Sequence, residues 1–114
     1  MKKLTIVLII LIIFIGIGTV YYRNLDNNYS ALEDFYSFPI PNDAVLEEAN
    51  DYANNYYWEP STGTSIPMKY RLVIYKNGWK KAGIDGSSVI YEKNNYQYQI
   101  TVVYAKEYIG IGRN

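Results

Sequence analysis

Aromatic side chains give this chain its clearest capacity for recognition chemistry. The candidate interaction surface combines aromatic residues with two neighbouring lysines, namely Tyr56, Tyr57, Trp58, Trp79, Lys80 and Lys81. Residues 56–58 are consecutive, so in a regular element their rings cannot all face the core. Exposed rings stack on sugars or anchor a protein interface. The competing interpretation is that the rings fill the core, and the abundance of Tyr, Asn and Ile along the whole chain favours it.

The residue types present in this chain give little support for catalysis. The chain has no cysteine and no histidine, which excludes a thiol nucleophile, a histidine base and a cysteine or histidine zinc site. A serine nucleophile would need a lysine base, but no Ser-x-x-Lys motif occurs. We therefore predict no catalytic residue, no metal ligand and no cofactor, and we expect that the protein is not an enzyme.

Acidic residues offer the one arrangement that could attract a metal ion. Asp43, Glu47, Glu48 and Asp51 would share one side of a helix. The alternating oxygen ligands and the glycine turn of a calcium loop are missing, so a solvated acidic face is the better interpretation.

Net charge limits the partners. The chain carries 11 basic and 11 acidic residues, a formal charge of zero. Binding to nucleic acid draws on a basic excess that neutralises phosphates. We therefore expect no nucleic-acid partner.

The first 22 residues predict a signal-anchor transmembrane helix. Residues 4–22 are almost wholly apolar and would extend about 28 Å as a helix, at ~1.5 Å per residue. Lys2 and Lys3 precede this run and outweigh Arg23, so the N-terminus should remain in the cytoplasm. We expect a single-pass protein of the cell membrane, with the rest of the chain outside.

Cleavage of this segment is the alternative to a retained anchor. Gly16 and Gly18 form a small-x-small site of the kind that signal peptidases accept. The apolar run continues past this site to Val20, which favours retention. A cleaved chain would be secreted.

Composition divides the remaining residues into a stalk and a folded domain. Residues 23–38 are rich in asparagine and acids, so we predict a stalk or linker there. Pro39 and Pro41 then impose an extended entry to residues 39–114, the predicted extracytoplasmic domain. A domain this small has little room for a substrate cleft.

Two stretches of this domain are compatible with either a helix or a strand. Between residues 44 and 57, apolar side chains recur at helical spacing, but Asn54-Asn55 is typical of a turn between two strands. Between residues 66 and 77, apolar and basic residues alternate as in a strand, yet Pro67 and Asn77-Gly78 are typical helix boundaries.

The C-terminal third predicts antiparallel strands. Residues 87–93 alternate, and Asn94-Asn95 forms a turn. The following strand has an aromatic and β-branched face, made by Tyr96, Tyr98, Ile100, Val102 and Tyr104. Residues 83–86 are expected to form a hairpin turn and residues 108–111 a short closing strand.

One ordered pattern resembles a known group of proteins. It consists of Pro39-Ile-Pro-Asn-Asp-Ala44, Ile66-Pro67, Tyr70, Ile74, Gly78-Trp79-Lys80-Lys81, Gly86 and Tyr91-Glu92-Lys93. The pattern resembles uncharacterised small exported proteins of low-GC Gram-positive bacteria that carry one N-terminal anchor or signal. This resemblance implies a helix before the Gly-Trp pair and an antiparallel sheet around it. It implies no catalytic residue.

Taken together, these features predict an α+β protein: a transmembrane helix followed by a small domain of antiparallel strands packed with one or two helices. The expected function is a non-enzymatic module that binds an envelope protein, or an accessory or immunity factor. The alternative is a cell-wall carbohydrate-binding module that uses exposed aromatic rings. The membrane itself is the remaining partner, through residues 4–22.

Overall fold

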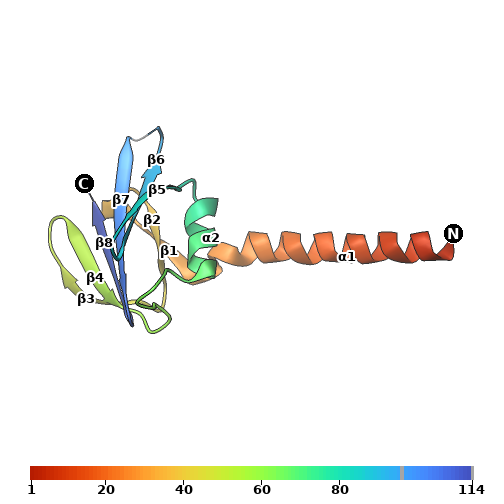
Figure 1. The fold of residues 1–114 in the computed structure, drawn as a ribbon, viewed down its shortest axis with the longest axis horizontal. Coiled ribbons are helices and arrows are strands. Elements are labelled where there is room, and N and C mark those ends of the chain that lie inside the picture. Colours follow the sequence, from red (N-terminus) through yellow and green to blue (C-terminus); the bar gives the residue numbers. More distant parts are fainter. Residues whose placement is uncertain (96, 114) are drawn as a thin grey trace.

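The computed structural model describes residues 1–95 and 97–113, and it has a long N-terminal helix joined to a small α+β body (Figure 1). This confirms the predicted fold class. The helices are α1 (Lys2–Asn24) and α2 (Met68–Lys76), with 3-10 turns η1 (Leu25–Asn28) and η2 (Glu33–Phe35). The strands are β1 (Tyr29–Leu32), β2 (Phe38–Pro41), β3 (Val45–Ala49), β4 (Ala53–Tyr57), β5 (Lys80–Asp85), β6 (Ser88–Lys93), β7 (Tyr98–Ala105) and β8 (Tyr108–Arg113).

Helix α1 projects from the body without packing against it along most of its length (Figure 1). Its 23 residues give about 35 Å of helix, at ~1.5 Å per residue, and none of them is buried. The helix is long and apolar enough to cross a membrane.

Six antiparallel strands form the main sheet, in the order β3-β4-β8-β7-β6-β5. A second, two-stranded sheet pairs β1 with β2. This hairpin and α2 lie between the main sheet and α1, so they cover the sheet face that points toward α1 (Figure 1). The opposite face of the main sheet points away from α1.

The hydrophobic core fills the layer between the sheet and its cover. Alternate residues of the central strands supply one side, including Ile100, Val102 and Ile111, each fully buried. Phe38 of β2 and Trp79 supply the other side, and their rings meet edge to face at 5.1 Å.

The prediction of a stalk over residues 23–38 is wrong. Leu25, Phe35 and Phe38 from this segment are buried, at 3%, 3% and 0% exposure. Burial of such large apolar side chains outweighs the polar composition around them. Most of the segment therefore belongs to the folded body, which begins at Leu25 rather than at residue 39.

Residues 44–57 form two strands rather than a helix. The turn between them lies at Asn50, whose side-chain oxygen accepts hydrogen bonds from the backbone N–H groups of Tyr52 (2.8 Å) and Ala53 (2.9 Å). Asn54-Asn55, read from sequence as a turn, lies inside β4. The local asparagine-to-backbone hydrogen bonds fix the reversal four residues earlier.

Residues 68–76 form a helix, as the resemblance implies, despite their strand-like alternation. Pro67 precedes the first turn with φ −54°, and Gly78 ends the segment with φ +90°, a conformation that glycine adopts without strain. The buried positions are Tyr70, Val73 and Ile74, which share one side of a helix.

The C-terminal strands agree with the sequence prediction. Strands β6 and β7 pair antiparallel around a turn at Asn94 and Asn95, both with positive φ. Tyr98, Ile100, Val102 and Tyr104 lie on one face, whereas Tyr96 is outside the described residues. The turn predicted at residues 83–86 is displaced, since Gly83 pairs with Ile90 inside the sheet and the chain reverses at Gly86.

Candidate functional site

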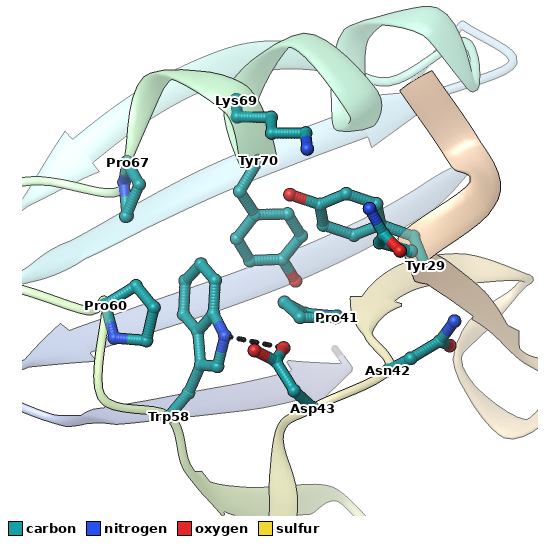
Figure 2. A pocket seen from close by; sticks show the side chains of 10 residues that line it. Tyr29, Pro41, Asn42, Asp43, Trp58, Pro60, Pro67, Lys69 and Tyr70 are labelled. Carbon is teal, nitrogen blue, oxygen red and sulfur yellow. Dashed lines mark hydrogen bonds between the residues drawn. The ribbon is translucent and has the colours of Figure 1, made fainter. Parts of the chain in front are cut away.

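A pocket of about 400 Å³ opens between the β1–β2 hairpin, the end of β4 and the first turn of α2 (Figure 2). Its volume lies in the range of small-molecule sites, although the small size of the domain led us to expect little room for a cleft. Its walls are made by aromatic, proline and amide side chains, with one acid and one base: Asn28, Tyr29, Pro41, Asn42, Asp43, Trp58, Pro60, Pro67, Lys69 and Tyr70.

Prolines make three of these walls rigid. Pro41 ends β2, Pro60 follows β4 and Pro67 precedes α2. The ring of each proline fixes φ and removes a backbone donor, so these segments present apolar surface with little freedom to collapse.

Three aromatic rings in contact form one wall of the pocket. Tyr70 lies between the other two rings, with its centroid 5.7 Å from Tyr29 in a stacked arrangement and 5.5 Å from Trp58 in an edge-to-face arrangement. The Tyr70 hydroxyl donates a hydrogen bond to the Pro39 carbonyl at 2.7 Å. This bond ties the first turn of α2 to β2 and fixes the position of the central ring.

Hydrogen bonds hold the polar side chains at the edge of the pocket in place. The Trp58 indole N–H donates to Asp43 Oδ1 at 2.9 Å, which fixes both side chains (Figure 2). The loop that carries Trp58 is held by a hydrogen bond from its backbone N–H to the Glu107 carbonyl at 2.8 Å. Lys69 projects from α2 over the opening.

The pocket tyrosines stay protonated near neutral pH. Burial raises the pKa of Tyr70 well above its ordinary value of 10, and the neighbouring tyrosines raise it further. Burial, and then the charge of Asp43, raise the pKa of Tyr29. Neither hydroxyl can act as a base at this pH.

The six residues of the predicted interaction surface do not form one surface. Tyr56, Trp58 and Trp79 are buried at 6%, 5% and 0% exposure, so the core interpretation of these rings is correct. Of this aromatic set, only Trp58 lines the pocket. Trp79 instead packs under β2, with Lys93 Nζ 5.6 Å from its ring.

Tyr57, Lys80 and Lys81 are the members that solvent reaches. Tyr57 is half-buried on β4, whereas both lysines are exposed on β5, the edge strand at the other side of the sheet. Strands β8, β7 and β6 separate them, so an aromatic patch joined to a basic pair does not exist.

Sequence reasoning missed most of the pocket. Tyr29 lies in the segment predicted to be a stalk, and the predicted acidic helix face that includes Asp43 does not form. Tyr70, Asp43 and Trp58 meet only because the hairpin, β4 and α2 converge. A usable signal was the nearness of Trp58 to Pro60 and of Tyr70 to Pro67, two and three residues apart in the sequence.

A second candidate surface is the face of the main sheet that the β1–β2 hairpin and α2 do not cover, which we call the open face. The register places Val45, Tyr57 and Tyr108 in one row across β3, β4 and β8, with Val103 on β7 beside them. Val45, Tyr108 and Val103 are 58%, 44% and 45% exposed, and the rings of Tyr57 and Tyr108 meet edge to face at 5.5 Å. A groove of about 440 Å³ runs beside them over Gly110.

Acidic residues lie around this face. The nearby Glu107 carboxylate raises the pKa of the Tyr57 hydroxyl most, and slight burial adds to the effect. Within residues 1–95 and 97–113, however, no three acidic side chains lie close enough together to hold a metal ion.

In comparisons with protein-family models, curated proteins and solved structures, this chain has no match.

Proposed function

We propose that the protein is a single-pass membrane protein that displays a small binding domain outside the cell membrane. Helix α1 is the anchor, with its N-terminus in the cytoplasm because Lys2 and Lys3 precede the apolar run. Its apolar side chains are exposed from Leu4 to Val20, which in water would be unfavourable and in a bilayer is not.

The domain functions by binding another envelope protein rather than by catalysis. The observation that carries this proposal is the open sheet face, which points away from α1 and holds Val45, Val103 and the Tyr57–Tyr108 pair. Large exposed apolar side chains gathered on one face are typical of protein interfaces, where tyrosine is enriched.

The shape of this face supports the same partner class. Gly110 and Gly112 leave β8 with little relief, and the Asn55 side chain lies across Gly110. The acids Glu47 and Glu48 border the groove at the edge strand β3. An apolar centre with a charged rim matches the layout of protein–protein contacts.

Site-specific photo-crosslinking in living cells tests this proposal. A crosslinking amino acid at Val103 should give a discrete adduct with one envelope protein, whereas the same group at the exposed Ile84 of β5 should not. Tyr108→Lys should abolish the Val103 adduct by placing a charge in the contact. The matched variant Tyr52→Lys, at an exposed position of the β3–β4 turn, should leave it intact.

The proposal fails if the crosslink pattern does not depend on this face. An adduct formed equally from Val103 and Ile84, or one that survives Tyr108→Lys, would show that the open face is not the contact. Expression and membrane localisation of each variant serve as controls for folding.

The pocket supports a second candidate function, binding of a cell-wall saccharide. Its aromatic lining of Tyr29, Trp58 and Tyr70 lies beside Asp43 and Asn42, so it combines apolar surface with hydrogen-bonding groups, as sugar sites do.

The two tryptophans provide a matched test of this candidate. Trp58 lines the pocket and Trp79 is buried elsewhere. Titration with soluble wall fragments should shift the fluorescence of Trp79→Phe, which retains Trp58, and leave that of Trp58→Phe unchanged. Equal shifts in both variants, or none in either, would remove the saccharide function.

A further inference from the structure

Helix α2 has two different faces. Tyr70, Val73 and Ile74 are buried against the core. On the other side, Met68, Leu72 and Tyr75 are 68%, 43% and 66% exposed, and their spacing of four and three residues forms one apolar stripe. The basic residues Lys69, Arg71 and Lys76 flank this stripe, and α2 contains no acid.

The C-terminal end of α2 is fastened to the last turns of α1. Lys76 Nζ lies 2.9 Å from Asp26 Oδ2, donates to the Tyr22 carbonyl at 2.5 Å and sits 4.6 Å from the centre of the Tyr22 ring. The Asn77 side-chain amide donates to Asp26 Oδ1 at 3.2 Å. These contacts fix α2 at the level where the apolar run of α1 ends.

The N-terminal end of α2 also lies beside α1. Lys69 lines a groove of about 570 Å³ together with residues of the last α1 turns and the first residue of η1, namely Gly16, Ile17, Val20, Tyr21, Asn24 and Leu25. Helix α2 therefore runs across the end of α1, and its exposed face is turned away from the sheet, toward α1 (Figure 1). If α1 crosses a bilayer, Tyr21 and Tyr22 mark the headgroup layer, and α2 lies at the same depth.

We propose that the exposed face of α2 is an interfacial membrane-binding surface, in which Met68, Leu72 and Tyr75 insert among the lipids and Lys69 and Arg71 bind the phosphates of anionic lipids. Charge complementarity favours anionic lipid as the occupant, because basic side chains flank an apolar stripe in the manner of interfacial helices. The Lys69 groove continues this surface along the last turns of α1. This inference rests on the proposed membrane crossing of α1.

Single-cysteine spin labelling of the full chain tests the inference directly, because the natural sequence has no cysteine. Labels are placed at Leu72 on α2, at Ile12 in α1 and at Leu46 on β3, which lies on the far side of the body (Figure 1). The protein is reconstituted in vesicles of phosphatidylcholine, with or without phosphatidylglycerol. Collision rates with oxygen and with a water-soluble nickel complex report the depth of each label.

The Leu72 label should show a several-fold higher oxygen-to-nickel ratio than the Leu46 label, and phosphatidylglycerol should raise it further. The double variant Lys69→Gln, Arg71→Gln, at two exposed positions, should remove the increase caused by phosphatidylglycerol. The Leu46 label should be insensitive to lipid composition in both backgrounds.

The outcomes separate this inference from the proposed anchor. A Leu72 label as water-exposed as Leu46, with Ile12 in the hydrocarbon, overturns the interfacial helix and leaves the anchor standing. A Leu72 label of equal depth in both lipids overturns the binding of anionic phosphates. A water-exposed Ile12 label overturns the membrane crossing and this inference together.

Discussion

At the residue scale, the Tyr70 hydroxyl joins the pocket to the core. Its hydrogen bond to the Pro39 carbonyl is fully buried and connects residues 31 positions apart. Tyr70→Phe leaves that carbonyl without this donor and should lower the free energy of unfolding by about 1–3 kcal/mol. Urea denaturation of the full chain in detergent micelles measures the difference.

Tyr75→Phe on the same helix is the matched control, because Tyr75 is 66% exposed. Its free energy of unfolding should change by no more than about 0.5 kcal/mol. Equal stabilities of the Tyr70→Phe variant and the parent chain would contradict the role assigned to this hydroxyl.

Three tyrosines that are wholly or partly buried predict a loss of stability at alkaline pH. Burial raises the pKa of Tyr29, Tyr70 and Tyr91 in the folded chain, whereas an unfolded tyrosine titrates near 10. The folded state therefore holds these protons to higher pH. Their contribution to stability is complete below about pH 10 and is lost as the pH rises from there through the folded pKa values.

Tyrosinate absorbance measured together with far-ultraviolet circular dichroism checks this prediction. Part of the tyrosine absorbance should appear only with the loss of secondary structure. Ionisation of all tyrosines near pH 10, with the fold intact, would contradict the raised pKa values.

Residue patterns alone could predict part of the site and no more. The crowding at residues 56–58 correctly indicated that the rings cannot all share one environment, since Trp58 and Tyr56 are buried and Tyr57 is not. The pocket could not be predicted, because Asp43 and Trp58, 15 positions apart, are joined only by the strand arrangement that sequence left undecided.

At the element scale, the β1–β2 hairpin is an integral part of the folded body. Phe38 is fully buried against Trp79 and Tyr91. Phe38→Ala should lower the free energy of unfolding by about 3–5 kcal/mol, a large share of the ~5–15 kcal/mol of a small domain.

Phe14→Ala supplies the control, because Phe14 is 68% exposed on α1. In detergent it should leave the unfolding of the body unchanged. If residues 23–38 were a stalk, Phe38→Ala would be as harmless as Phe14→Ala, so the pair of variants decides between the two descriptions.

Element identity was predictable where local signals agreed. Alternation and the Asn94-Asn95 turn both indicated the β6–β7 hairpin, and the structure has it. Over residues 66–77 the signals conflicted, and the boundary residues Pro67 and Gly78 prevailed over alternation because they fix the backbone directly. The stalk was mispredicted because three buried apolar residues were dispersed among polar ones.

At the scale of the whole molecule, side-chain contacts join α1 to the folded body. The contacts of Lys76 with Tyr22 and Asp26 join the end of α1 to α2, and the open sheet face points away from α1 (Figure 1). Such an arrangement suits a domain displayed on a retained anchor. A chain cleaved near Gly18 would keep Tyr22 and Asp26, which contact α2, and would lose the apolar first turns of α1.

The measurement that tests the central claim most directly is cysteine accessibility in intact cells. Single cysteines replace Lys3 in α1 and Ile84 on β5, both exposed positions, and a membrane-impermeant maleimide is added before or after lysis. The account predicts a full-length chain in the membrane fraction, with Ile84→Cys labelled on intact cells and Lys3→Cys labelled only after lysis. The reverse labelling pattern, or a shortened chain released into the medium, would contradict it.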